Sequence, residues 1–252
     1  MQKKDKIIGI TLFSVLTCIL VFLSFFQGKK NSSDSIQKVI VDGNQLLSKD
    51  DYLRITGLDV LSINDSLTLR TVKERFENHP YIQSITLELK ADRTVEVSVI
   101  EKEIQAVVNI ETKNFLISKK YEVINILPNT QVVDYPVITN SSLTNLSVNK
   151  ICDSTDIKSA FKMIYATKQI DSNFSRMISE INLRNGKEAV IYLTGLNPVV
   201  LIGKNEEVKK IYVLYELLKQ NNKTVSMVRS SSYIDLRYSE NLFLGQRQLT
   251  GI

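Results

Sequence analysis

The sequence ITLELKADRTVEVSV, residues 85–99, contains two runs in which apolar and polar residues alternate, joined by a polar turn. Alternation with a period of two places successive side chains on opposite faces of a β-strand. Residues 90–94 include lysine, aspartate and arginine, as expected of a connection exposed to water. The stretch therefore predicts a hairpin with one buried face, formed by Ile85, Leu87, Leu89, Val95, Val97 and Val99.

A short strand and two helices are predicted upstream of this hairpin. Residues 39–41 form a β-branched run that turn residues end. Ser48 is suited to cap a helix that continues to Gly57, and a second helix with apolar residues at helical spacing ends before Pro80. The order strand, helix, helix, strand, strand predicts an α+β domain with two helices packed on one side of a three-stranded sheet.

Residues 7–26, IIGITLFSVLTCILVFLSFF, contain no charged residue and no proline. At a rise of about 1.5 Å per residue, a helix of this length spans the roughly 30 Å of a bilayer's hydrocarbon core. A cleaved signal peptide has a shorter apolar core and a small-x-small cleavage site, whereas this run is followed by Gln-Gly-Lys-Lys at 27–30. We therefore expect a retained transmembrane helix, with the six-residue tail in the cytoplasm and the larger part outside.

Charge and cysteine content argue against nucleic-acid binding and against a fold stabilised by a disulfide. The formal net charge is +5, but basic and acidic residues are interspersed, so the sequence gives little support to nucleic-acid binding. Cys18 in the predicted membrane segment cannot reach Cys152 in a folded outer domain, so no internal disulfide is expected. The fold must depend on its hydrophobic core.

The second half of the chain predicts a mostly antiparallel β domain with about two helices. Short apolar runs separated by polar turns predict strands at 107–108, 115–117, 123–124, 132–133, 199–202 and 225–228. The pair Asn185-Gly186 predicts a type I′ hairpin turn. One helix is expected after the capping residues 153–156 and a second from about 206 to 220, whose buried side is Val208, Ile211, Tyr212, Tyr215 and Leu218. The predicted parts are a tail at 1–6, a membrane helix at 7–26, a linker at 27–35, an α+β domain at 36–103, a β domain at 104–245 and a tail at 246–252.

Several motifs in this order resemble one family of bacterial proteins. They are Val-Asp-Gly-Asn at 41–44, His-Pro-Tyr-Ile at 79–82, Val-x-Val-x-Glu-Lys at 97–102 and Asp-x-Arg-Tyr at 235–238. Together with one membrane span, they resemble the POTRA domain and β domain of the FtsQ/DivIB cell-division proteins. The family often has a proline after the glutamate and basic residue, and this chain departs from that pattern with Glu-Lys-Glu-Ile at 101–104.

The resemblance implies a scaffold without chemistry of its own. Such a protein lies in the cytoplasmic (inner) membrane of a bacterium, as a single-pass type II protein with its N-terminus inside, at the division septum. Its implied partners are small bitopic proteins of the FtsB and FtsL type, with membrane lipid around the N-terminal helix and no nucleic acid or small-molecule substrate. The implied partner-binding residues are Tyr238, Leu242, Phe243, Leu244 and Gly245.

The residues themselves favour binding over catalysis. His79 is the single histidine and precedes a proline at a predicted helix end, where a capping or surface role is expected. No histidine or cysteine spacing suits a metal, and no glycine-rich phosphate loop is present, so no cofactor is expected. The alternatives are a membrane-anchored envelope enzyme or its accessory domain, and an outer-membrane assembly protein with a POTRA domain, for whose barrel the chain is too short.

The C-terminal strands offer the binding surface. The last strand of a sheet exposes backbone donors and acceptors to which a partner strand can add, and residues 242–244 contain no charged residue that would prevent this. The alternative is that these residues pack inward, and Tyr238 shares a face with Leu236, which makes it a core residue or a contact. On the opposite face of that predicted strand, Asp235 and Arg237 are placed to form an ion pair.

Overall fold

The computed structural model describes Val15, Thr17, Phe22 and residues 36–59, 67–131, 134–220, 222–238 and 241–245. The expected membrane segment at 7–26 lies outside these residues except at three positions, and the expected linker at 27–35 and tail at 246–252 lie wholly outside them. Within the described residues, no helix combines the length and apolar character needed to cross a membrane. The chain divides into two compact units, one ending at Ile100 and one that joins residues 45–47 to everything from Glu101 onward.

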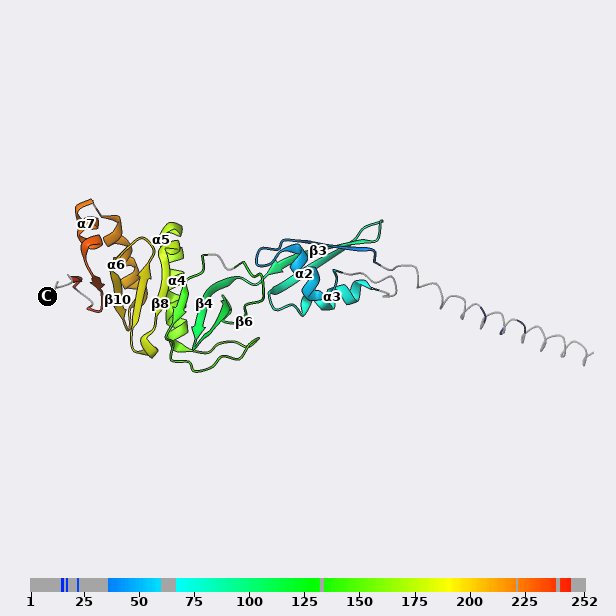
Figure 1. Cartoon of the computed structure of the whole chain (residues 1–252), viewed down its shortest axis with the longest axis horizontal. Helices are drawn as coiled ribbons and strands as arrows, with labels where there is room; N and C mark the ends of the chain where they lie inside the picture. The colour runs from blue at the N-terminus through cyan, green and yellow to red at the C-terminus, as the bar shows by residue number, and fades with distance from the viewer. Residues whose placement is uncertain are drawn as a thin grey trace, which may run out of the picture. The chain divides into compact units, whose positions relative to one another are not determined.

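The first unit contains the predicted hairpin and helices. Its elements, labelled as in Figure 1, are β1 (Lys38–Asp42), α2 (Lys49–Thr56), α3 (Leu69–Glu77), β2 (Ile82–Leu89) and β3 (Thr94–Glu101). In the described part of this unit the strands form one small sheet in the order β1-β3-β2, with β1 parallel to β3. The predicted order of elements is confirmed, as is the turn between the two alternating strands.

Local capping fixes the two helices of this unit. The Ser48 side chain accepts a hydrogen bond from the Asp51 N–H at the start of α2, and Gly57 ends this helix in a left-handed conformation. Asn78 is the C-cap of α3, and His79, which follows it, accepts a hydrogen bond at Nδ1 from the Tyr81 N–H at 3.2 Å in the turn after the helix. The expected surface position of His79 is wrong, because the ring is buried 4.8 Å from the Tyr52 ring.

The second unit is built on a large sheet. Its strands are β4 (Ile104–Ile110), β5 (Lys113–Ser118), β6 (Val123–Asn125), β7 (Val137–Thr139), β8 (Ile178–Asn182), β9 (Ala189–Leu193), β10 (Val199–Gly203), β11 (Tyr233–Asp235) and β12 (Phe243–Gly245). Among the described residues the order is β12-β11-β10-β9-β8-β7-β4-β5-β6. Most neighbouring pairs are antiparallel, as predicted, while β4 with β7, β7 with β8 and β10 with β11 are parallel.

One row of apolar side chains crosses this sheet from strand to strand. Its fully buried members, paired in register, are Val108, Ile138, Ile181, Ile191, Val200 and Ile234, and the row ends on β12 at the half-buried Leu244. The long helices α4 (Thr155–Ile170) and α6 (Glu207–Lys219) lie side by side and pack on this row (Figure 1). The core of the unit therefore lies between the two helices and one face of the large sheet.

The helices of the second unit differ from prediction. In addition to α4 and α6, the described residues include α5 (Ser172–Met177) and α7 (Asn222–Ser230), so the expectation of about two helices is too low. The predicted strand at 225–228 is wrong, because these residues lie inside α7. Val225 and Val228 are three positions apart and lie on the more buried side of that helix, whereas Met227 between them is exposed.

The buried side of α6 is also shifted from the prediction. Ile211 is buried as expected, but Val208 and Tyr212 are exposed, and the core is contacted by Leu214 and Leu217 instead. The predicted helix bounds differ from those observed by one residue at each end. Tyr215 and Leu218 also pack against the core as predicted, so the prediction is wrong only for Val208 and Tyr212, which have a core-like spacing but lie on the solvent face.

The β8–β9 hairpin is confirmed, but its turn is not of type I′. Residues 183–188 connect the strands through a short 3-10 segment in which Arg184, Asn185 and Gly186 all have positive φ angles, of 44°, 56° and 72°. A loop of this length replaces the two-residue turn that Asn185-Gly186 predicted. The predicted strand at 132–133 lies outside the described residues.

Replacing Gly43 with alanine is expected to destabilise the first unit. Gly43 has a φ of +85°, and a Cβ atom there would lie 2.4 Å from the Val99 carbonyl oxygen. We expect a loss of at least about 2 kcal/mol in urea unfolding, from backbone strain and displacement of β3. Gly57→Ala is the control in the same unit, since its φ is +66° but its nearest atom is the flexible end of Arg75 at 3.5 Å. Equal losses from the two substitutions would contradict a role for the close approach to Val99.

Candidate partner-binding edge

The large sheet ends at β6 on one side, and this edge is covered. The Val123 N–H donates to the Lys150 carbonyl at 3.0 Å, and the Val123 carbonyl accepts from the Asn149 N–H at 2.8 Å. The Cys152 N–H donates to the Tyr121 carbonyl at 2.7 Å. Residues 149–152 thus pair with the first residue of β6, Val123, and with Tyr121 just before the strand, and cover this part of the edge.

The opposite edge is β12, which is paired on one side only within the described residues. Its register with β11 joins Tyr233 to Gly245, Ile234 to Leu244 and Asp235 to Phe243. Outside β12 the described part of the chain supplies no further strand. Among the described residues, the outer side of β12 is therefore the edge at which strand pairing is left open.

The five predicted site residues lie close together at this edge, but their exposure differs. Phe243 is 50% exposed and Tyr238 is 58% exposed, and their rings meet edge to face at 5.5 Å. Leu242 and Leu244 are partly buried against the core, so the inward-packing alternative is correct for these two. Gly245 is buried, because a Cβ atom there would lie 2.0 Å from the Tyr233 ring.

The alternation of a longer strand predicted that Tyr238 shares the buried face of Leu236. In the structure it does not. Strand β11 ends at Asp235, so the period of two does not continue to Tyr238. Leu236 is 3% exposed, whereas the Tyr238 ring is at the surface beside Phe243. The exposed part of the edge thus consists of two aromatic rings.

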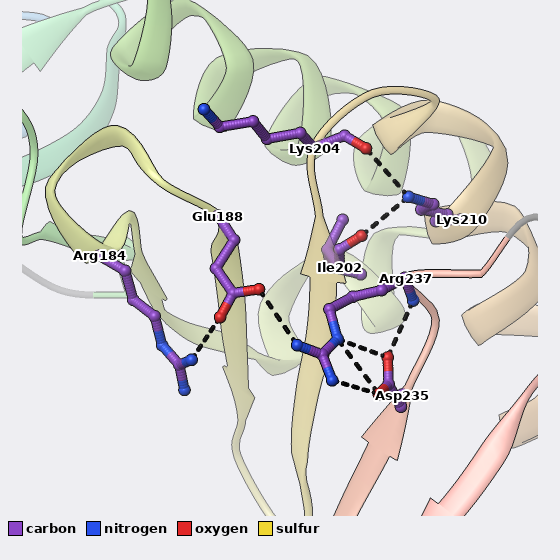
Figure 2. Close-up of polar contacts among 7 residues, drawn as sticks. All are labelled: Arg184, Glu188, Ile202, Lys204, Lys210, Asp235 and Arg237. Atoms are coloured by element: carbon purple, nitrogen blue, oxygen red, sulfur yellow. Dashed lines mark hydrogen bonds and ion pairs between the residues drawn. The ribbon is translucent and has the colours of Figure 1, made fainter.

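Ion pairs fix the segment that leads into this edge, as Figure 2 shows. The Asp235 carboxylate, in a residue that is 5% exposed, accepts from Arg237 Nε at 2.9 Å and from Arg237 Nη2 at 2.7 Å. Arg237 also lies 3.5 Å from Glu188, which in turn pairs with Arg184. The stem of Arg237 crosses Gly203, where a Cβ atom would be only 2.9 Å from it.

The predicted pair of Asp235 and Arg237 is confirmed, but it is less solvated than a simple surface pair. The Arg237 guanidinium holds the pKa of Asp235 below its ordinary value, through side-chain hydrogen bonds that outweigh the effect of burial. The pKa of Arg237 is raised in turn, first by its hydrogen bonds to Asp235. Arg237 is therefore held in one orientation beside the edge.

A buried lysine near this network was not predicted. Lys210 on α6 is 6% exposed, and its ammonium donates to the carbonyl of Ile202 at 2.9 Å and to that of Lys204 at 3.2 Å (Figure 2). These carbonyls lie at the end of β10 and in the loop that follows. Lys210 precedes the buried Leu214 and Leu217 by four and seven positions, so helical spacing places it on their face, but the prediction had assigned other residues to the buried side.

The described residues do not assemble a catalytic constellation. No group of three or more His, Cys, Asp or Glu side chains suited to a metal occurs among them. His79 is buried in the first unit between two tyrosine rings. A polar cleft of about 450 Å³ lies near the start of α4 and α6, and its carboxylates are engaged, with Asp156 accepting from the Ser142 N–H and Glu207 from the Ser159 hydroxyl.

Comparisons with known families agree with this architecture. An FtsQ-type POTRA domain model matches residues 35–102, and the model of the C-terminal domain of cell division protein FtsQ/DivIB matches residues 106–237. The chain belongs to the FtsQ/DivIB family. FtsQ/DivIB proteins are non-enzymatic cell-division proteins. A search of curated proteins finds no match.

The Glu-Lys motif of this FtsQ/DivIB chain has a structural role. The Glu101 carboxylate accepts hydrogen bonds at 3.0 Å from the N–H groups of Gln45 and Leu46, which belong to the second unit with it. Lys102 forms a half-buried ion pair with Glu122 at 2.7 Å. These contacts hold the start of β4 and do not require the proline that is absent after Lys102.

Asp235→Asn is expected to weaken the fold in a pH-dependent way. Because the folded-state pKa of Asp235 lies below an unfolded value of about 3.9, the contact stabilises the protein above that value, and the stability is lost as pH falls through the folded-state pKa. We expect a loss of about 1 to 2 kcal/mol at pH 7, discounted for the partly exposed Arg237. The loss measured by urea unfolding should shrink as the pH is lowered below about 3.9, because the carboxyl then becomes protonated in the unfolded and, at lower pH, in the folded state.

Asp153→Asn is the control for this measurement. The Asp153 carboxylate also pairs with a basic residue, Lys158, but its side chain is 85% exposed. Removing this charge should leave stability unchanged at neutral and at low pH, because water replaces the contact. A pH-independent loss in Asp235→Asn would show that the ion pair is not its cause.

Proposed function

We propose that the protein is a bitopic scaffold of the bacterial division machinery that holds partner proteins without chemistry of its own. Residues 7–26 anchor it in the cytoplasmic membrane with the N-terminus inside, and both folded units work outside the cytoplasm at the septum. Membership of the FtsQ/DivIB family supports the cell-division role. The length and apolar character of residues 7–26 support the anchor.

The partner binds by adding a strand to β12. The observation that supports this mode is the contrast between the two edges of the large sheet, since β6 is covered by residues 149–152 and the outer side of β12 is left open within the described residues. An open edge supplies backbone donors and acceptors to any extended segment. Small bitopic proteins of the FtsB and FtsL type are the proposed source of that segment.

Phe243 and Tyr238 give the open edge its recognition surface. Side chains on one face of a sheet interact with their neighbours on the adjacent strand. An added strand would therefore lie beside the exposed Phe243 ring, and the Tyr238 ring in contact with it extends the apolar surface. Aromatic rings of this kind often carry much of the binding energy of an interface.

Phe243→Lys is expected to abolish binding while the chain stays folded. The side chain is half exposed, so lysine is tolerated by the fold, but its charge would lie against the added strand. Co-purification with the FtsB- and FtsL-type proteins of the same organism, together with circular dichroism, measures both effects. Leu244→Lys is a poorer test, because Leu244 packs against the core and its replacement would also destabilise the sheet.

Tyr212→Lys is the matched control. Tyr212 is 55% exposed, which is similar to Phe243, but it lies on the solvent face of α6 and belongs to neither β11 nor β12. It should leave co-purification intact. Undiminished binding by Phe243→Lys, or equal losses from both variants, would contradict the proposed edge.

A further inference from the structure

A small cavity lies between α6 and the segment that joins β11 to β12. Its volume is about 150 Å³, which is close to that of one side chain and of cavities that hold a benzene molecule. Three aliphatic residues, Val213, Leu236 and Leu242, line it together with the Tyr238 ring. The remaining lining residues are polar: Glu206, Lys209, Lys210 and Asn241. We call this cavity the Lys210 pocket.

Lys210 is the unusual member of this lining. It is 6% exposed, and its ammonium makes two hydrogen bonds, both to backbone carbonyls, among the described residues. An ammonium group has three N–H donors and a full charge. The described residues include no ion pair for it, and the carboxylates of Glu207 and Asp235 act on it only at longer range.

The position of Lys210 adds to this electrostatic cost. It is the fourth residue of α6, close to the positive end of the helix dipole, where a cation is disfavoured. Its neighbour Lys209 differs, because it is paired with Glu206 at 3.5 Å and its side chain is 61% exposed. Lys210 is thus a buried cation in a pocket whose lining is half polar and half apolar, and the one acidic residue of that lining, Glu206, is paired with Lys209. Such a cation, without a carboxylate in contact among the described residues, is suited to an incoming anion.

The pocket lies where a side chain from an added strand would reach. Leu242 and Leu244 both pack towards the helix-covered face of the large sheet, and Leu244 ends the row of apolar residues that crosses it. A strand paired with β12 would direct alternate side chains to the same face. One of these side chains would lie next to Leu242, at the entrance of the pocket.

We propose that the Lys210 pocket receives an acidic side chain of the partner segment that pairs with β12. The methylene groups of a glutamate would lie against Val213, Leu236 and Leu242, and its carboxylate would accept the third N–H of Lys210. This inference rests on the proposed function and adds the chemistry that the partner must present. The competing explanation is that Lys210 serves only to hold the β10–α6 loop through the two carbonyls.

Double-mutant cycles separate these explanations. The probe is the purified extracytoplasmic segment of the FtsB-type protein from the same organism, prepared as wild type and as variants that each change one Asp or Glu to the amide. Each is titrated against the full chain and against Lys210→Met. We expect that changing one particular carboxylate to the amide weakens binding to the full chain about tenfold or more. The same change should not weaken binding to Lys210→Met any further, because the charged hydrogen bond is already lost in that variant.

Two further variants serve as controls for the double-mutant cycle. Lys219→Met removes the same charge from an exposed lysine of α6 that does not line the pocket, and the critical carboxylate should keep its effect in that background. Val213→Trp fills the pocket from a position that is 38% exposed, so it decides the question if Lys210→Met unfolds. It should abolish the effect of the same carboxylate.

The outcomes also distinguish this inference from the proposed function. If Phe243→Lys abolishes binding but no carboxylate couples to Lys210 or to a filled pocket, the edge is supported and the pocket inference is overturned. If the critical carboxylate couples equally to Lys219, the contact is a general charge effect and the inference is likewise overturned. Coupling confined to Lys210 and Val213 supports it.

Discussion

The row of apolar side chains that crosses the large sheet depends on unbroken strand pairing, and it stops at β12. Each strand contributes one fully buried residue to this row, from Val108 on β4 to Ile234 on β11, and the helices α4 and α6 cover it. At Leu244 on β12 the row is only half buried. A further strand would continue both the backbone hydrogen bonds and the apolar row, so the same edge is incomplete in two independent ways.

The surroundings of this edge restrict its movement. β12 contains three residues, and its only pairing within the described residues is with β11. Arg237, which follows β11, is tied to Asp235 and to Glu188 at the start of β9, and it crosses Gly203 at the end of β10. The ring of Tyr233 covers Gly245. These contacts order the segment that follows β11, and the pairing with β11 orders β12 itself, which lowers the entropy that a partner must remove on binding.

Much of the fold could be predicted from the sequence, because periodicity and capping are local signals. The alternating residues 85–99 and the Ser48 and Gly57 caps specify the elements of the first unit without reference to distant residues. The errors occur where tertiary packing decides. Residues 225–228 have the composition of a strand but form part of α7, and α6 turns Leu214 and Leu217 inward in place of Val208 and Tyr212. The sequence allows a strand or a helix at 225–228 and two different buried sides for α6, and only contacts with the sheet select between them.

In the candidate site, too, local features could be predicted from the sequence, whereas features that depend on tertiary packing could not. The ion pair of Asp235 with Arg237 could be anticipated from neighbouring residues, because it depends on local strand geometry. The exposure of Phe243 could not, because the apolar run at 242–244 allowed either inward packing or contact with a partner. The cover over β6 and the burial of Lys210 could not, since each brings together segments far apart in the sequence or depends on packing against them.

A three-residue strand cannot hold a partner by backbone pairing alone. Each hydrogen bond adds about 0.5 to 1.5 kcal/mol net, and the two or three that β12 can offer fall short of the roughly 8 kcal/mol of a micromolar complex. The exposed pair of Tyr238 and Phe243 and the Lys210 pocket are placed where they can supply more. If residues 7–26 and the partner's own membrane span lie in one membrane, the partner segment is also present at a raised effective concentration near β12. A weak edge then suffices for stable assembly, and it leaves little drive for the same edge to pair with wrong strands.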